Sequence, residues 1–252
     1  MERIIEIRPN FFIVGAAKSG TKSLANYLDQ HPNVFVCKPK EPNFFALPPN
    51  ATPTCIGPDS EERLYELLLK YSITDWESYQ QLFISADTAT AVGDASIRNL
   101  YNENSAQRIA NHCPEARIIV LLRHPVDRMY SHYHMNVHLH IEPARFEEAF
   151  DAEDHRFEQG WGWDWHYRRV SMYADQLDRY FQHFERKQIL LLDYNDFKKD
   201  PQEVVKVVFA HLGVNPDFIP DTSKKLFVGK SPKSRFMCFR AKQQVPCPGN
   251  TG

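Results

Sequence analysis

Long apolar runs are missing from this chain of 252 residues. No stretch approaches the about 18 to 20 consecutive apolar residues that a membrane-spanning helix needs, so no membrane span is expected. The first ten residues, MERIIEIRPN, contain no apolar stretch of the kind found in secretory signals. We therefore expect a cytoplasmic protein without a membrane span.

Paired cysteines and an excess of positive charge are also missing. The five cysteines are spread along the chain and form no C-x-x-C pair, which predicts neither a zinc site nor a redox motif. We expect reduced, mostly buried thiols. The 30 basic residues are balanced by 32 acidic residues, for a net charge of −2. This balance argues against a nucleic-acid partner, whose binding surface would be basic.

The apolar residues that are present predict an α/β protein. Hydrophobic residues make up 42% of the chain and aromatic residues 13%, enough for one sizeable core. Short apolar runs alternate with amphipathic stretches, a pattern typical of βαβ units and a mostly parallel sheet. The expected strands are 11–15, 34–37, 91–94, 117–122 and 188–193. The expected helices lie near 20–30, 61–71, 98–112, 125–138, 173–184 and 201–211.

The first of these strands runs into a glycine loop, FFIVGAAKSGTKS at 11–23. Gly15 and Gly20 have the spacing of a Walker A loop, but Thr21 follows the second glycine where that motif has lysine. The lysine stands two residues earlier, at Lys18. The loop and the helix after it still suit a phosphate, since the amides of a helix N-terminus favour an anion. The shifted cation predicts a phosphate site of another enzyme class.

The fourth strand leads into a second phosphate-type segment, RIIVLLRHPVDRMYSHYHM at 117–135. Its fully apolar run, 118–122, is typical of a central parallel strand buried on both faces. Arg123 stands at the carboxyl end of this strand, where open α/β sheets bind ligands. Pro125 then begins a helix, and Ser131 lies about two turns into it. Arginine offers a planar fork of donors to phosphate oxygens.

The two segments together resemble the donor site of sulfotransferases that use 3′-phosphoadenosine-5′-phosphosulfate (PAPS) and release PAP. The resemblance covers roughly residues 9–240, and KPKEPNFF at 38–45 resembles the K-E-x-x-F-F segment of heparan sulfate and bacterial members. It implies a P-loop-like three-layer α/β fold with a central, mostly parallel sheet flanked by helices. We expect a single domain over 1–242 and a disordered tail over 243–252.

The resemblance also implies a role for each site residue. Arg123 and Ser131 would bind the 3′-phosphate of PAPS, and Glu41 would be the catalytic base. Lys18 would stabilise the leaving phosphate as well as hold the donor. The 5′-phosphosulfate would lie on the loop residues Lys18, Ser19, Gly20, Thr21, Lys22 and Ser23. In the C-terminal segment KSPKSRFMCFR, which resembles the family only loosely, Lys230, Lys233 and Arg235 are further predicted phosphate contacts.

One segment departs from the family pattern. Where many relatives have G-E-[KA]-[ST]-P-x-Y, this chain reads GDASIRNLY at 93–101. Asp94 keeps the carboxylate and Ser96 the hydroxyl, but Ile97 replaces the proline and no lysine is present. Substrate contacts from this segment are therefore in doubt.

Two other functions stay open at this level. A P-loop-like nucleotide kinase would need a lysine after Gly20, where Lys22 is one place late, and an aspartate for magnesium, for which Asp94 is available. A catalytically silent PAP-binding module would keep the donor site without turnover. The acceptor, a small molecule or a carbohydrate with a hydroxyl or an amine, cannot be read from the sequence, and neither can the oligomeric state.

Three further segments have ordinary structural interpretations. His134 and His138 share a helix face, but the sequence has no H-E-x-x-H motif and PAPS chemistry requires no metal, so we expect no metal site. The Pro-rich stretch 46–60 is expected to be a loop, either a plain connector or a lid near the substrate. Core packing and a ligand pocket are equally compatible with Trp161, Trp163 and Trp165.

Overall fold

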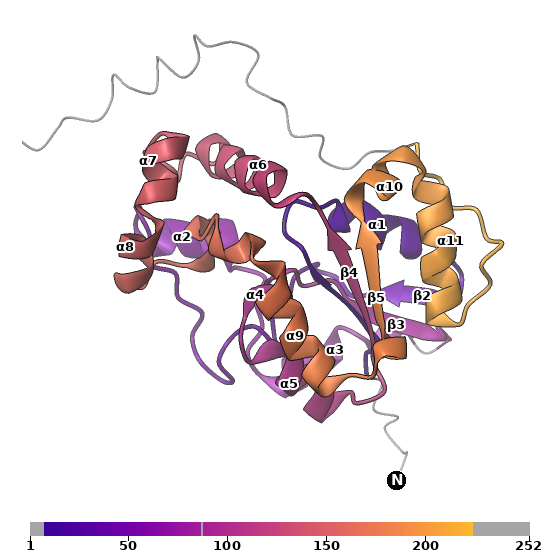
Figure 1. Cartoon of the computed structure of the whole chain (residues 1–252). Coiled ribbons are helices and arrows are strands. Elements are labelled where there is room, and N and C mark those ends of the chain that lie inside the picture. Colours follow the sequence, from indigo (N-terminus) through magenta and orange to yellow (C-terminus); the bar gives the residue numbers. More distant parts are fainter. Residues whose placement is uncertain (1–7, 87, 224–252) are drawn as a thin grey trace, which may run out of the picture.

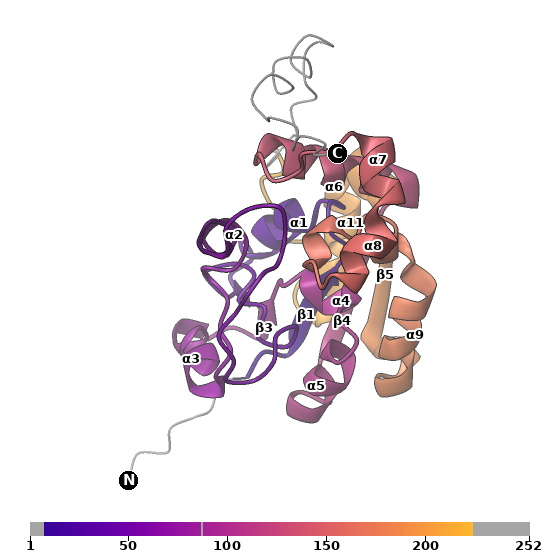
Figure 2. The same cartoon turned by 90° about the vertical axis from the view of Figure 1, so that its left-hand side faces the viewer.

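The computed structural model describes residues 8–86 and 88–223, which form a parallel sheet covered by helices on both faces (Figure 1). The strands are β1 (Phe11–Gly15), β2 (Val34–Val36), β3 (Ala91–Asp94), β4 (Arg117–Leu122) and β5 (Ile189–Asp193). Their order in the sheet is β2-β3-β1-β4-β5, and every neighbouring pair is parallel. Figure 2 shows β3, β1, β4 and β5 side by side in this order. The predicted α/β fold is confirmed.

The helices of the described residues match the expected ones closely, with α4 and α5 in place of a single helix over 98–112. Four short helices, α3, α7, α8 and α10, lie outside the expected ranges. The full set is α1 (Thr21–Leu28), α2 (Glu61–Leu68), α3 (Trp76–Gln81), α4 (Arg98–Tyr101), α5 (Ser105–His112), α6 (Pro125–His138), α7 (Phe146–Asp151), α8 (Glu153–Glu158), α9 (Tyr173–His183), α10 (Tyr194–Lys199) and α11 (Pro201–Leu212).

Alternating side chains divide the core into two layers. Phe12 and Val14 of β1 point to one face of the sheet, where they pack with residues of α3, α4, α5 and α9. Phe11 and Ile13 point to the opposite face, where they pack with α1 and α11. All four side chains are fully buried. Because successive side chains of a strand point to opposite faces, one apolar run supplies both layers of a three-layer fold.

The strand order creates a topological switch point at the carboxyl ends of β1 and β4. These strands are neighbours, but the chain leaves β1 towards β2 on one side and leaves β4 towards β5 on the other. Such a switch point opens a crevice beyond the strands, where α/β proteins bind ligands. Helices α6 and α7 lie beyond this end of the sheet (Figures 1 and 2).

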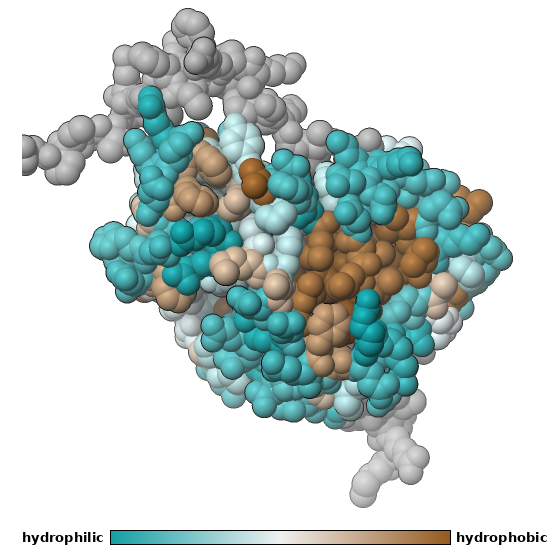
Figure 3. Space-filling model, in the orientation of Figure 1, coloured by the Kyte–Doolittle hydropathy of each residue, from teal (hydrophilic) through white to brown (hydrophobic). Residues whose placement is uncertain are grey.

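Strand β5 forms one edge of the sheet, and part of its surface is apolar. Figure 3 shows a hydrophobic area over β5 and α11. Leu191, Leu192, Val204 and Val207 line a shallow hollow there. None of the predicted site residues lies among them. Across the described ranges 8–86 and 88–223, no helix is long and apolar enough to cross a membrane.

Candidate active site

The loop after β1 brings Lys18 to the start of α1. Lys18 and Gly20 both have positive φ angles, 65° and 89°, so the chain turns sharply between strand and helix. Glycine adopts this conformation without strain. A Cβ atom on Gly20 would lie 3.2 Å from ring atoms of both Tyr194 and Phe197. The first hydrogen bond of α1 runs from the Leu24 N–H to the Gly20 carbonyl, so the amides of the first turn precede the helical ladder.

Arg123 lies directly after β4 and contacts this loop. Its Nη1 donates a hydrogen bond to the carbonyl oxygen of Lys18 at 3.1 Å. The guanidinium lies over the ring of Tyr194, 4.9 Å from its centroid. Its Nε atom is buried and has no hydrogen-bond partner within the described part of the chain. A buried charged donor without a partner is costly, which points to a ligand that completes the site.

Positive charge is concentrated around Lys18. The pKa of Lys18 is lowered first by burial and then by the nearby charges of Arg123 and Arg128, while Glu41 opposes the shift. Three cations gathered near the carboxyl ends of β1 and β4 favour an anionic ligand, because an anion would offset their mutual repulsion. Ser19 and Thr21 lie buried in the same turn, Ser23 is half-buried and Lys22 is exposed.

Glu41 approaches from the loop after β2. Its Oε1 pairs with Nζ of Lys40 at 3.0 Å, and 35% of its side chain is exposed. Its charge acts on both Lys18 and Lys22, which places the carboxylate near the β1–α1 loop. The structure therefore brings the predicted base and the predicted leaving-group cation to the same end of the sheet. Their catalytic roles stay predictions.

Ser131 lies on α6 with its side chain half-buried. Arg128, one turn earlier on the same helix, is a site residue that our sequence analysis missed. It is fully buried, and burial lowers its pKa to about 10. It donates to Oγ of Ser171 and to the Tyr167 carbonyl, both at 2.6 Å. Only its position three residues before Ser131, on the same helix face, could have singled it out.

His132 is also fully buried beside Arg128. Nη1 of Arg128 donates to Nδ1 of His132 at 3.1 Å. Arginine has no acceptor atom, so Nδ1 is unprotonated and the proton of the neutral ring is on Nε2. Burial, followed by the charge of Arg128, lowers the pKa of His132 well below its ordinary value. This histidine is therefore a neutral donor at physiological pH.

His134 and Asp94 are the residues on which a metal site and a kinase magnesium site would depend. His134 packs edge-on against Tyr130, and no group of three potential metal ligands occurs among the described residues. Asp94 is fully buried and accepts hydrogen bonds from Tyr79 and Ser96 at 2.9 and 2.6 Å. A carboxylate engaged in this way is not open to the magnesium ion that a kinase would require.

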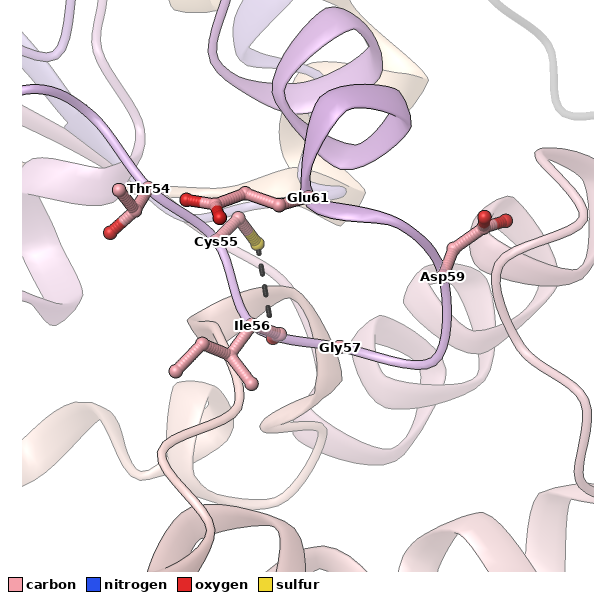
Figure 4. A pocket seen from close by; sticks show the side chains of 6 residues that line it. All are labelled: Thr54, Cys55, Ile56, Gly57, Asp59 and Glu61. Atoms are coloured by element: carbon pink, nitrogen blue, oxygen red, sulfur yellow. Dashed lines mark hydrogen bonds between the residues drawn. The ribbon is translucent and has the colours of Figure 1, made fainter.

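The tryptophan segment and the loop 46–60 pack against each other. Trp165 is fully buried in a small second core with Cys55 and Leu64. Trp163 instead lies under the guanidinium of Arg98, 4.8 Å from the ring centroid. The loop carries a hollow of about 320 Å³, lined by Thr54, Cys55, Ile56, Gly57, Asp59 and Glu61 (Figure 4). Because none of these is a predicted site residue, the hollow gives the loop no link to the chemistry.

Several predicted residues lie outside the described ranges. These are the C-terminal contacts Lys230, Lys233 and Arg235 and the tail 243–252.

Comparison with known proteins identifies the family. The profile described as "Sulfotransferase domain" matches residues 8–233. The chain belongs to this family. A crystal structure of a sulfotransferase from Alicyclobacillus acidocaldarius is 40% identical, with a TM-score of 0.79 over 88% of this chain and 87% of that one. The P-loop-like fold of sulfotransferases is therefore shown for this chain.

More distant curated relatives are much longer proteins. The bifunctional heparan sulfate N-deacetylase/N-sulfotransferase 3 of Mus musculus is 24% identical over 226 residues, which cover 86% of this chain and 24% of that protein. The N-deacetylase/N-sulfotransferase 1 of Xenopus laevis is 26% identical over 254 residues, which cover 94% and 25%. The chain thus spans about a quarter of the length of these relatives.

Proposed function

We propose that this sulfotransferase moves a sulfuryl group from PAPS to a hydroxyl or amine of an acceptor. The observation that carries the proposal is the contact between Arg123 and the Lys18 carbonyl, which joins the two phosphate-type loops at neighbouring strand ends. A donor that carries a 5′-phosphosulfate and a separate 3′-phosphate on its ribose requires two such loops. Membership of the sulfotransferase family supports the same donor.

The residues present fit PAPS. The first turn of α1 and the loop residues 18–23 would bind the 5′-phosphosulfate, and Gly20, with its positive φ, lets the chain turn into that helix. Arg123 and Ser131 would hold the 3′-phosphate, which would give the buried Nε of Arg123 the acceptor it lacks. PAPS supplies the activated sulfuryl group, and the protein supplies positioning and charge.

The proposed chemistry is an in-line displacement at sulfur. The acceptor oxygen or nitrogen forms a new bond to sulfur while the bond from sulfur to the bridging phosphate oxygen breaks. Glu41 takes the acceptor's proton, and PAP leaves with the bonding electron pair. Lys18 offsets the negative charge that develops on the bridging oxygen. The proximity of Glu41 to Lys18 supports this division of roles.

The acceptor is proposed only as a class. The names of the curated relatives refer to heparan sulfate and to N-sulfation, which supports a carbohydrate amine or hydroxyl, while small molecules stay open. A screen of amine and hydroxyl acceptors with labelled PAPS, followed by the mass gain of the product, tests the proposal. Absence of transfer to every class tried would favour one of the two alternatives, the silent PAP-binding module or the nucleotide kinase.

Ligand-dependent stabilisation separates the alternatives before any acceptor is known. A ligand that binds only the folded state raises the unfolding temperature. We expect PAP to do so and ATP with magnesium to have little effect. The reverse result would favour the nucleotide kinase. Stabilisation by PAP together with a failed acceptor screen would favour the silent module.

A further inference from the structure

The backbone that carries Glu41 has an unusual conformation. Glu41 and Asn43 both have positive φ angles, 65° and 55°, on either side of Pro42. Asparagine tolerates this left-handed region, but for glutamate it is strained. Such a conformation persists only where neighbouring contacts hold it.

Contacts from two other segments hold this turn. The N–H of Asn43 donates to Oγ of Ser96 at 3.1 Å, and the Ile73 N–H donates to the carbonyl of Pro42 at 2.8 Å. The Asn43 side chain donates to Oγ of Ser72 at 3.1 Å. Phe44 and Phe45 follow immediately and are buried in the core. The position of Glu41 is therefore set by its neighbours in the chain rather than by its own ion pair with Lys40.

Ser96 is itself oriented by Asp94, the last residue of β3. Oγ of Ser96 donates its only proton to Oδ1 of Asp94 at 2.6 Å, so its lone pairs face the Asn43 N–H. The Tyr79 hydroxyl donates to the other carboxylate oxygen at 2.9 Å. All three side chains are fully buried. An ionised Asp94 thus satisfies both hydroxyl donors and leaves Ser96 free to accept.

We propose that Asp94 and Ser96 are positioning residues for Glu41, acting through the backbone of Asn43. This inference rests on the proposed role of Glu41 as the base. It explains why the segment GDASIRNLY keeps a carboxylate and a hydroxyl although it lacks the lysine and proline of many relatives. The two groups orient the turn through buried hydrogen bonds and need not touch the substrate.

The arrangement depends on the charge of Asp94. Burial raises its pKa to about 6, while the hydrogen bonds from Ser96 and Tyr79 oppose the shift. Glu41, Lys40 and Cys37 face it from the loop after β2, and Tyr180 faces it from α9. When Asp94 takes up a proton it must itself donate, so either Ser96 or Tyr79 loses its acceptor. Turnover should therefore fall as the pH drops through about 6.

Hydrogen exchange tests the contact without any acceptor. In Ser96→Ala the Asn43 amide loses its acceptor, and its exchange should be about 5- to 10-fold faster, the worth of one neutral hydrogen bond. Ser105→Ala is the matched control. Ser105 is also fully buried, and its hydroxyl donates to the Phe45 carbonyl in the same loop, outside the left-handed turn. The control should leave the Asn43 amide unchanged.

Steady-state kinetics test the link to the base. Ser96→Ala should lower kcat by about 10- to 100-fold, because misplacing a catalytic group by about 1 Å costs on that order. PAP affinity and the KM for PAPS should change by less than about twofold, since the donor loops are not involved. Asp94→Asn offers only one acceptor oxygen, like the protonated acid, and cannot titrate, so kcat should be lowered at all pH values and the acid limb near pH 6 should disappear.

The outcomes separate this inference from the proposed function. Absence of sulfuryl transfer by the unmodified protein would refute the proposed function, while the exchange experiment would still decide whether Ser96 holds Asn43. Unchanged exchange in Ser96→Ala would overturn the positioning contact. Faster exchange with a kcat no lower than in Ser105→Ala would overturn the link to Glu41. If Ser96→Ala fails to fold, Asp94→Asn decides, and an acid limb retained in that variant overturns the inference.

Discussion

Arg123 donates a hydrogen bond from Nη1 to the carbonyl oxygen of Lys18 at 3.1 Å, although the two residues are 105 positions apart. Each stands just beyond the carboxyl end of a strand, and β1 and β4 are neighbours in the sheet. The contact ties the two loops that we propose to bind the 5′-phosphosulfate and the 3′-phosphate of the donor. The position of one loop therefore depends on the other.

Replacing Arg123 by alanine should weaken PAP binding by about 1.5–3 kcal/mol, the scale of a hydrogen bond to a charged group. Isothermal calorimetry measures this loss directly. Arg123→Lys keeps the charge but not the planar fork, and we expect intermediate affinity. Lys187→Ala removes an exposed cation elsewhere on the surface and is the control for net charge. Unchanged PAP affinity in Arg123→Ala would remove Arg123 from the donor site.

The sheet was predictable because its strands are strongly patterned. Ile118 to Leu121 are all fully buried, as the uninterrupted apolar run indicates. Three expected strands, 11–15, 91–94 and 117–122, have the bounds found in the structure, and the other two differ by one residue. The break between α4 and α5 at Asn102–Asn104 was missed, because local propensity does not show where a tertiary contact ends a helix.

The site was predictable only where a motif marks it. Lys18, Arg123 and Glu41 lie in recognisable segments, and the structure brings them to one end of the sheet. Arg128 and His132 were missed as a pair because their burial depends on Ser171 and Tyr167, which come from a distant segment. The role of Asp94 was equally hidden, since its partner Tyr79 lies on a helix that the pattern did not reveal.

Lys18→Ala should lower turnover more than it lowers PAP affinity. Loss of a preorganised cation at the leaving oxygen costs about 10²-fold in kcat. Lys18→Arg restores charge with a different shape and should recover part of the loss. Steady-state kinetics beside PAP calorimetry separate the two effects. A raised KM for PAPS with unchanged kcat would show that Lys18 contributes only to binding.

The same lysine predicts the basic limb of the pH profile. Because burial and the charges of Arg123 and Arg128 lower the pKa of Lys18, it loses its proton at a lower pH than an ordinary lysine. If turnover requires the positive charge of Lys18, it should therefore begin to decline at a lower pH than it would with an ordinary lysine. The Lys18→Arg variant should keep its activity to higher pH, since arginine stays protonated. If turnover declined at the same high pH in Lys18→Arg and in the unmodified protein, this role of Lys18 would be contradicted.

Glu41→Gln keeps the size of the side chain but cannot take a proton. On a hydroxyl acceptor kcat should fall by about 10²- to 10⁴-fold, the usual worth of general base catalysis. An amine acceptor that is already neutral should show a smaller loss. PAP affinity should be preserved, which calorimetry checks. A variant with nearly unchanged turnover on a hydroxyl acceptor would exclude Glu41 as the base.

His166 should make the protein less stable in acid. Burial, followed by the charge of Arg169, lowers its pKa to about 4, and its Nδ1 lies 2.8 Å from the Tyr101 hydroxyl. The unfolded chain takes up this proton below about pH 6.5, but the folded protein does so only near pH 4. Stability is therefore lost as the pH falls through this window, by at most about 1.4 kcal/mol per pH unit from this residue.

Urea unfolding of His166→Gln at a series of pH values measures that contribution. The free energy of unfolding should depend less steeply on pH in the variant than in the unmodified protein between about pH 6.5 and pH 4. Asp94, whose raised pKa acts in the opposite direction, is present in both proteins and cancels in the difference. His138→Gln, on the exposed face of α6, is the control and should leave the slope unchanged. Parallel curves for His166→Gln and the unmodified protein would mean that His166 is not held neutral in the fold.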